Sequence, residues 1–220
     1  MYYPFMLYNT HIEHQPIFRD LQGDPFVADL SWQSSLVTTA TFRDQKGFQK
    51  ILENHMVPDH SWGFSPYLER RDTLLADCPQ MAAERRFIHL GVDIIGPVRT
   101  PLHAPLSAVI ETAGYEAGEG NYGGYVLLRH EGRGFKTFFS LYGHLSRNCL
   151  PSAGDTFAAG EMFAEIGDYP DNGNWFHHTH LQIITEKGLA SGYLSKGYCT
   201  EQDLLEMNNL CPSPMPLFLR

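Results

Sequence analysis

Two short histidine patterns carry the residue types that metal chemistry needs. His178 and His180 lie two apart in the run HTH, and His89 precedes Asp93 by four residues in HLGVD. On a β-strand, residues i and i+2 share one face, so the two histidines of HTH would project to the same side. One of them could bind a metal ion while the other stands beside it.

The HLGVD pattern needs a bend before both of its side chains can reach one ion. A straight strand would separate the Cα atoms of His89 and Asp93 by about 13 Å, slightly more than two side chains can span onto one metal. Gly91 stands midway, so we expect it to supply both the flexibility and the open space. His55 and Asp59 form a second such pair, which we interpret as a chance match because no β pattern surrounds it.

Two histidines and one carboxylate leave a fourth coordination position for water, which is typical of a catalytic zinc site rather than a structural one. Such a site lowers the pKa of the water to about 7 and polarises a carbonyl oxygen, which suits amide hydrolysis. A further imidazole could act as the base, and another could stabilise the developing oxyanion. His178, beside His180, and His144, in LYGHLS, are the candidates for these two roles.

Short β-rich runs surround these histidines, and turns of Gly, Pro, Asn and Asp separate the runs. Six such runs without intervening helices predict a mainly β, β-rich α+β fold with an antiparallel sheet or barrel-sandwich-like core. We expect residues 86–190 to form this core. Residues 1–85 would be a helical or irregular N-terminal extension that packs on the core without forming an independent domain, and residues 191–220 a short C-terminal helix and tail.

Two stretches outside the core have helical apolar spacing: residues 42–56, and residues 201–210, which end before Pro212. The four cysteines show no CxxC spacing and therefore predict neither a zinc ribbon nor a thioredoxin motif: Cys78, Cys149, Cys199 and Cys211. A disulfide between Cys199 and Cys211 stays open.

Composition and charge exclude several classes of protein. The 220 residues are 43% hydrophobic, which is enough to bury a core and excludes wholesale disorder. The chain has 16 Lys and Arg and 25 Asp and Glu, a net charge of −9, so a nucleic-acid partner is not expected. The first twenty residues do not read as a signal peptide, and no apolar run is long enough for a membrane helix. We therefore predict a cytoplasmic protein without a membrane partner, and leave a place in the cell envelope, reached by an unrecognised route, as the alternative. The oligomeric state has no sequence signal.

The chain resembles the lysostaphin/LytM-type zinc metallopeptidases in five motifs that occur in order: HLGVD, GNYGGYVLLRH, SLYGHLS, GDTFAAGEMFAEIGD and HTHLQI. The resemblance covers about residues 86–185 and implies an enzyme, a zinc endopeptidase on a β-barrel-like scaffold. It implies one zinc per chain and the following roles: His89, Asp93 and His180 as ligands, His178 as general base, and His144 assisting at the transition state. Peptidoglycan peptides are the implied substrate class, so a peptide or muropeptide is the expected partner.

The chain departs from the family pattern around the expected substrate cleft. Arg99 and Ala108 replace two usual glycines, and Trp175, Phe176 and His177 precede HTH where small residues are usual. These changes leave the metal set intact and alter the surroundings of the substrate. With the HLQ ending and the CPSP tail, they are similar to the cytoplasmic subgroup that is fused to aminotransferase and kinase modules. We interpret His177 as a loop residue rather than a further ligand.

Other functions fit parts of the pattern. A catalytically weak metal-binding or regulatory module could keep this fold and all five site residues. A glucose-type phosphocarrier has an HFGID stretch similar to HLGVD, in which the histidine takes a phosphoryl group, but HTHLQI and YGHLS count against it. An upstream segment carrying His11 and His14 could also hold the site latent by occupying the open metal position.

Overall fold

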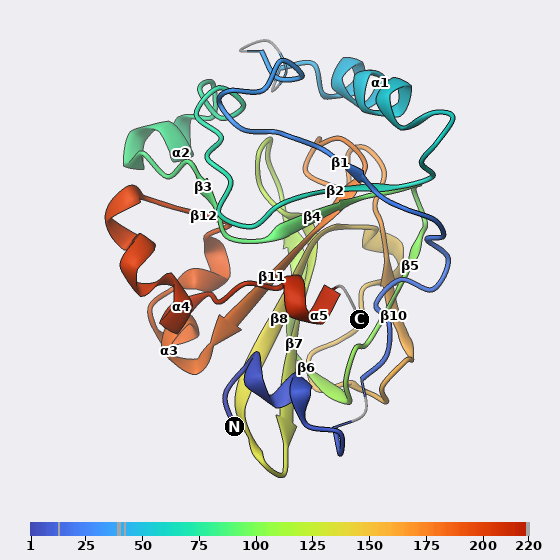
Figure 1. Ribbon diagram of the computed structural model, residues 1–220, viewed down its shortest axis with the longest axis vertical. Helices are drawn as coiled ribbons and strands as arrows, with labels where there is room; N and C mark the ends of the chain where they lie inside the picture. The colour runs from blue at the N-terminus through green and yellow to red at the C-terminus, as the bar shows by residue number, and fades with distance from the viewer. Residues whose placement is uncertain (13, 39–40, 42, 219–220) are drawn as a thin grey trace.

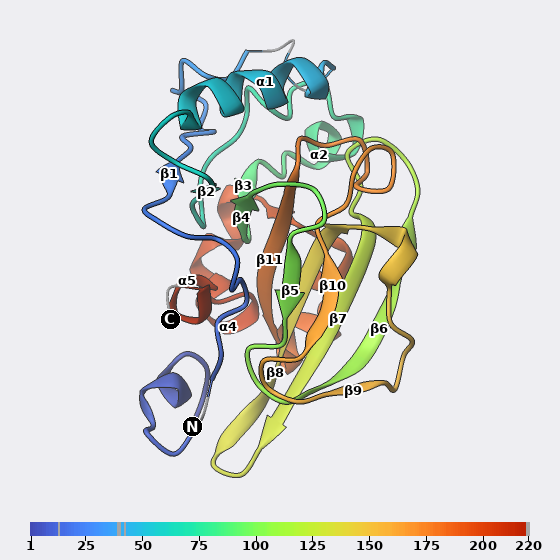
Figure 2. The ribbon, with the colours of Figure 1, turned by 90° about the vertical axis from the view of Figure 1, so that its right-hand side faces the viewer.

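A large sheet forms the body of the protein in the computed structural model, which describes residues 1–12, 14–38, 41 and 43–218. Figures 1 and 2 show this sheet from two sides. Its eight strands within the described residues, in spatial order, are β1 (Phe26–Val27), β2 (Gly63–Ser65), β4 (Val92–Ile95), β11 (His178–Thr185), β8 (Phe135–Leu145), β7 (Gly123–Gly132), β6 (Ala108–Glu116) and β9 (Thr156–Phe157).

Neighbouring strands of this sheet are antiparallel except β1 and β2, which run parallel. The antiparallel sheet predicted for the β core is therefore confirmed, and the N-terminal extension adds one parallel pair that the sequence did not predict. Within the described residues, β1 and β9 form the two edges, so the sheet is open. Of the sheet and the barrel that the sequence left as alternatives, the sheet is the one that forms. Each edge strand has only two residues, too few to pair across the gap and close a barrel.

A smaller sheet of β5 (Pro101–His103) and β10 (Met162–Glu165) lies against the large one and gives the core its sandwich-like character. Figure 2 shows these two strands in front of β11 and β8. The largest buried cluster joins apolar side chains of both layers, among them Leu102, Phe163, Val126, Tyr142 and Ile183. Burying each large apolar side chain contributes about 1.5–3 kcal/mol, so this interface holds the layers together.

A third sheet pairs β3 (Ile88–His89) with β12 (Tyr198–Cys199), and so brings the C-terminal part beside His89. Cys199 and Cys211 are free thiols here, as are the other two cysteines. The disulfide that the sequence left open is therefore not formed.

Helix α1 (Gln45–Met56) confirms the helix predicted over residues 42–56, whose first residue lies outside the described ones. The helix begins after Asp44, whose side chain accepts a hydrogen bond from a first-turn N–H at 2.9 Å and satisfies one otherwise free donor. The predicted apolar face buries Phe48, Leu52 and Met56 and leaves Ile51 exposed. Phe48 packs edge-on against Phe176, with ring centroids 5.3 Å apart, and this contact ties the helix to the loop before β11.

The helix predicted over residues 201–210 is split into a 3-10 helix, Glu201–Glu206, and α4, Met207–Leu210. A capping box between Thr200 and Asp203 starts the first of them. Sequence periodicity did not predict the remaining helices, which are too short to show it: α2 (Pro79–Glu84), α3 (Glu186–Ala190), α5 (Met215–Phe218) and the 3-10 helices Phe5–Tyr8, Arg147–Cys149 and Tyr193–Ser195.

The N-terminal extension, residues 1–85, runs from the far end of the β7–β8 hairpin to α1 at the opposite end of the molecule (Figures 1 and 2). Tyr3, Met6 and Ile17 from its first part lie in the largest core cluster. Strand β2 pairs with β4 and so lies beside Asp93. In the part of the chain that the structure describes, no helix has the length and hydropathy needed to cross a membrane.

Candidate metal centre

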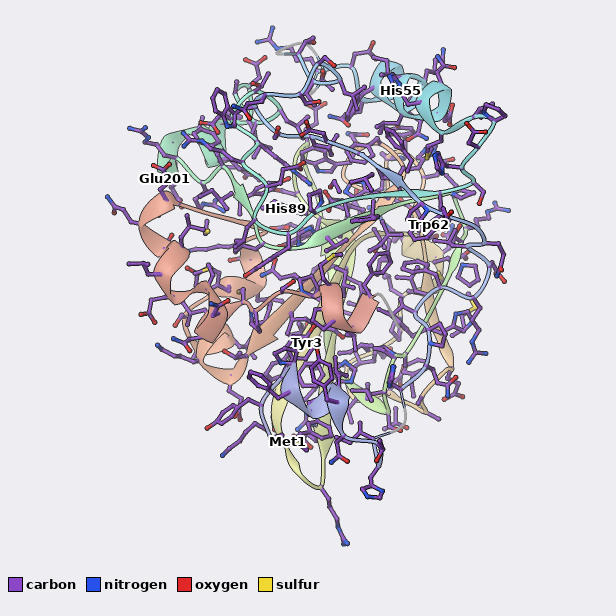
Figure 3. All side chains as sticks on the ribbon, viewed as in Figure 1. Met1, Tyr3, His55, Trp62, His89 and Glu201 are labelled. Carbon is purple, nitrogen blue, oxygen red and sulfur yellow. The ribbon has the colours of Figure 1, made fainter. Side chains whose placement is uncertain are left out.

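Three candidate ligand atoms from three strands lie close together: His89 Nε2 from β3, Asp93 Oδ1 from β4 and His180 Nδ1 from β11. The two nitrogens lie 3.0 Å apart, and Asp93 Oδ1 lies 3.1 Å from each of them. The β4–β11 register places His180 directly opposite Asp93. Figure 3 shows His89 inside the molecule, whereas His55, from the second HxxxD pattern, lies on the exposed side of α1.

The bend predicted between His89 and Asp93 lies at Gly91, in the break between β3 and β4. A Cβ on this residue would lie 2.5 Å from Cε1 of His180 and 2.6 Å from the carbonyl oxygen of Leu181. Real Cβ atoms do not approach other atoms so closely, so glycine is required here for the ligand ring to lie against the backbone.

Outer hydrogen bonds fix the tautomers of the two ligand histidines. His89 Nδ1 lies 3.3 Å from the carbonyl oxygen of Pro66, which can only accept, so Nδ1 carries the proton and Nε2 is bare. His180 Nε2 donates in the same way to Gln182 Oε1 at 3.0 Å. The Gln182 amide is oriented for this, because its Nε2 donates to the carbonyl oxygens of Tyr193 and Lys196. Both nitrogens that face Asp93 Oδ1 are therefore lone-pair donors.

The charges in the site favour the same protonation states. Burial, with the nearby Arg71 guanidinium, lowers the pKa of His89 to about 3, so its imidazole is neutral at pH 7. Burial alone would raise the pKa of Asp93, but the charged guanidinium of Arg71 lies beside the carboxylate, and this pKa is held well below its ordinary range. The carboxylate is therefore ionised.

This donor set fits a zinc ion. Three lone-pair atoms that face one another with no proton between them repel unless a cation lies among them. Their separations of 3.0 and 3.1 Å are close to the roughly 3.3 Å expected between ligand atoms placed 2.0–2.1 Å from a tetrahedral zinc. Two imidazoles and one carboxylate, with a fourth position left over, are the ligands of catalytic zinc sites.

His178 and His144 lie together beside the three ligand atoms, with ring centroids 4.3 Å apart. His178 Nδ1 donates to the carbonyl oxygen of Phe176 at 2.8 Å, and its Nε2 lies 3.7 Å from Asp93 Oδ1. His144 Nδ1 donates to the carbonyl oxygen of Asn172 at 2.9 Å. Each ring therefore keeps a bare Nε2, and the five side chains that the resemblance implies for the site lie in one cluster.

Burial also sets the protonation states of these two rings. It lowers the pKa of His178 to about 4. Burial, together with the neighbouring His178 and His180, holds the pKa of His144 well below its usual value. Both rings are therefore neutral at neutral pH.

His144 is held in an unusual backbone conformation. Its φ of 61° lies in the left-handed region, which costs a residue with a Cβ on the order of 1 kcal/mol or more. Two backbone hydrogen bonds hold it there, from its own N–H to Tyr122 and from the N–H of Gly167 to its carbonyl oxygen. Such local strain, held by the surroundings, fixes the direction of the imidazole.

A cavity of about 80 Å³ opens beside the cluster. Its other walls come from α2 and the residues after it (Gln80, Met81, Arg86), from the loop before β7 (Asn121, Tyr122), from the loop before β11 (Trp175, Phe176), and from the segment before β12 (Ser195, Gly197). Gln80 Nε2 donates to Asn121 Oδ1 at 2.8 Å, so a hydrogen bond joins two of these walls. The bulky loop noted in the sequence does line the cleft, through Trp175 and Phe176.

Sequence reasoning missed a group of polar residues behind Asp93. Arg71, which is 1% exposed, lies with Nη1 2.6 Å from Asp93 Oδ2, and Ser65 Oγ lies 3.3 Å from the same oxygen. Glu69 contacts Arg71 from the other side, with Oε2 2.7 Å from Nε. The one signal in the sequence was the charged run ERRD, at residues 69–72, which reads equally well as exposed surface.

Other histidines lie outside the cluster. His177 Nε2 contacts Asp168 Oδ1 at 3.1 Å, away from the ligand atoms, and does not line the cavity. His130 is buried against Ser140, with Nε2 2.7 Å from Oγ. Among the described residues, neither His11 nor His14 lines the cavity, so the latent arrangement is not seen.

A comparison with protein families matches residues 87–191, just under half of the chain, to peptidase family M23. No curated protein sequence matches the chain. Neither result tests the resemblance to the fused cytoplasmic subgroup, which stays a prediction.

Similar solved structures include three peptidases. A variant catalytic domain of the prophage-encoded M23 protein EnpA from Enterococcus faecalis is 20% identical, over 51% of this chain and 75% of that one, with a TM-score of 0.38. The catalytic domain of the antimicrobial peptidase lysostaphin from Staphylococcus simulans is 21% identical, over 55% and 80%, with a TM-score of 0.39. A zinc-containing peptidase from Vibrio cholerae is 18% identical, over 44% and 27%, with a TM-score of 0.35.

Proposed function

We propose, from the match of residues 87–191 to peptidase family M23, that the chain is a zinc-dependent peptidase that hydrolyses amide bonds. One observation carries the proposal: the bare Nε2, Oδ1 and Nδ1 atoms of His89, Asp93 and His180 meet within 3.1 Å of one another. These residues would hold the zinc. When bound, zinc polarises a carbonyl group and lowers the pKa of a water molecule toward about 7.

His178 is the proposed general base. Its Nδ1–H is donated to the Phe176 carbonyl, so its Nε2 is the only ring atom that can accept a proton from water. The ring of Phe176 stacks on that of His178, with centroids 4.1 Å apart, and fixes its plane. The imidazolium that forms is stabilised by the Asp93 carboxylate, whose Oδ1 lies 3.7 Å from Nε2. The proton is then available for the leaving amine.

His144 is proposed to assist at the transition state. With its Nδ1–H donated to Asn172, its bare Nε2 accepts a hydrogen bond, which suits orientation of the attacking water. A donor role toward the oxyanion would instead require a proton on Nε2. Both roles need the ring where the left-handed backbone holds it.

Peptides are the proposed substrates, and peptidoglycan-type peptides are the first class to test, because the sequence resemblance implies them. The cavity is small and has walls of mixed character, with Arg86, Glu116 and Asn121 beside Met81 and Trp175. Amide, guanidinium and carboxylate groups of this kind can bind the backbone and charged ends of a peptide.

A binding or regulatory module is the second candidate. It is favoured by the hydrogen bond between Gln80 and Asn121, which joins two walls of the cavity. The phosphocarrier alternative is disfavoured, because His89 is 0% exposed and its Nε2 faces His180, where no phosphoryl donor could reach it.

A hydrolysis assay separates the peptidase from the binding module. Purified chain loaded with zinc is incubated with a panel of muropeptides and linear peptides, and products are identified by mass spectrometry. Cleavage that a chelator stops and zinc restores is expected. Bound zinc without cleavage of any peptide would favour the binding module.

A further inference from the structure

Arg71 is a fully buried arginine from outside the segment that matches the peptidase family, yet it contacts one of the three candidate ligands. We propose that Arg71 is a positioning residue that holds Asp93 as a one-oxygen ligand, so that the N-terminal extension is a structural part of the metal centre. This inference rests on the proposed zinc site.

Backbone hydrogen bonds bring Arg71 to this place. The N–H of Arg71 donates to the Phe87 carbonyl at 2.8 Å, and the N–H of His89 donates to the Glu69 carbonyl at 3.0 Å. Residues 69–71 therefore run beside the strand that carries His89. Any displacement of this part of the extension moves Arg71 and the ligand strand together.

The two oxygens of Asp93 have separate partners. Oδ1 faces His89 and His180, whereas Oδ2 accepts hydrogen bonds from Arg71 Nη1 at 2.6 Å and from Ser65 Oγ at 3.3 Å. Arg71 Nη2 also donates to Ser65 Oγ, which closes a ring of hydrogen bonds on the Oδ2 side. The carboxylate can therefore neither rotate nor present both oxygens to a metal ion.

The guanidinium is itself held in place. Its Nε donates to Glu69 Oε2 at 2.7 Å, and Nη1 also reaches Tyr198 Oη at 3.2 Å. Glu69 is fixed in turn, because its Oε1 accepts from the N–H of Leu30 at 2.8 Å. The planar guanidinium of Arg71 thus donates hydrogen bonds to four side chains at once, a geometry that the ammonium group of lysine cannot reproduce.

Stability alone is a poor explanation for these buried charges. Burying an ion pair costs desolvation that its attraction often only offsets, and a well-packed apolar set of similar volume is often at least as stable. Orientation of a ligand is a different matter, because hydrogen bonds to a ligand's outer atoms typically change metal affinity by about 10- to 100-fold. The hydrogen bonds to Asp93 Oδ2 are of the kind that orients a ligand.

The test compares Arg71→Lys with Arg70→Lys. Arg70 is the adjacent residue, is 43% exposed and pairs with Asp72 and Glu201, so the control makes the same chemical change without touching Asp93. Zinc affinity is measured by competition with a chromophoric chelator, and the cobalt-substituted proteins are compared by visible absorption. The unfolding temperature of each metal-free protein shows whether the variant is folded.

We expect Arg71→Lys to bind zinc about tenfold or more weakly than the parent and to show an altered cobalt spectrum, with Arg70→Lys unchanged in both. A folded Arg71→Lys whose zinc affinity and cobalt spectrum match those of Arg70→Lys would overturn the inference, even if its unfolding temperature falls. If the parent itself binds no zinc, the proposed function fails first.

Ser65→Ala decides the matter if Arg71→Lys does not fold. It removes one hydrogen bond from Asp93 Oδ2 and one partner of Arg71, and leaves every charge in place. A loss of zinc affinity of about threefold or more supports the inference, because a side chain that only joins the extension to the core would lower stability alone. An unchanged affinity in folded Ser65→Ala overturns it.

Discussion

Gly91 and His180 lie so close together that a Cβ on residue 91 would be 2.5 Å from Cε1 of the imidazole. The ligand ring is therefore packed directly on the backbone of the strand break that separates His89 from Asp93. A side chain at this position must displace either the ring or the strand.

Gly91→Ala is expected to weaken zinc binding by about tenfold or more and to destabilise the fold by about 1–3 kcal/mol, because the added methyl group overlaps the ring. Zinc titration and urea unfolding measure the two effects. Gly96→Ala is the matched control, since a Cβ there meets its nearest neighbour at an ordinary 3.5 Å. Equal zinc affinity in the two variants would show that the close approach does not constrain the site.

His178→Ala is expected to keep one zinc per chain and to lose peptide hydrolysis by about 100-fold or more, because the proposed base is removed and no ligand is. Zinc content and turnover are measured on the same preparation. His177→Ala, which changes the adjacent histidine on Asp168, should retain both. Full turnover in His178→Ala would refute the assignment of the base.

Zinc should stabilise the folded protein, since the ligand atoms are assembled only in that state. At a free zinc concentration of about 100 times Kd, the free energy of unfolding should rise by about 2.7 kcal/mol. Calorimetry with added zinc measures the shift in Tm, and magnesium, which prefers oxygen ligands, should give none. An unchanged Tm with saturating zinc would contradict a site built from these three strands.

Acid should destabilise the protein partly through His130, which lies in the core away from the metal centre. Burial lowers the pKa of His130 to about 4, below the ordinary value of 6.5, so between these values the unfolded chain binds the proton more readily. Stability is therefore lost as the pH falls from about 6.5 toward 4, and this group contributes roughly 2 kcal/mol of that loss at pH 5. It contributes nothing above pH 7.5 or so.

The pH effect is measured as the free energy of unfolding in urea at pH 7.5 and pH 5, for the metal-free parent and for His130→Asn. The asparagine side chain is polar and does not titrate, so the difference between the two pH values should be smaller in the variant by roughly 2 kcal/mol. The same difference in both proteins would show that His130 is not the group responsible.

Local spacing was enough to predict the candidate ligands. Alternation along a strand places His178 and His180 on one face. A straight strand would hold the Cα atoms of His89 and Asp93 too far apart to share one ion, which indicated a bend at Gly91. Each of these arguments needs only the geometry of one strand. The β core and α1 were predictable for the same reason, because their apolar periods extend over enough residues.

What the sequence could not predict depends on contacts between distant segments. Arg71 and Ser65 lie more than twenty residues before Asp93, and no local period distinguishes a buried charge from an exposed one. The addition of β1 and β2 to the sheet could not be predicted either. These strands have two and three residues, too few to show a period in the sequence. The helix over residues 201–210 divided because its short turns are set by caps and packing rather than by periodicity.

The most direct measurement is the zinc content per chain, by elemental mass spectrometry, of parent and His180→Ala purified without added metal. His177→Ala serves as the control for the loss of a nearby imidazole. About one zinc in the parent and in the control, with almost none in His180→Ala, is the result expected of the site. Equal zinc in parent and His180→Ala, or none in the parent even after zinc is supplied, would contradict it.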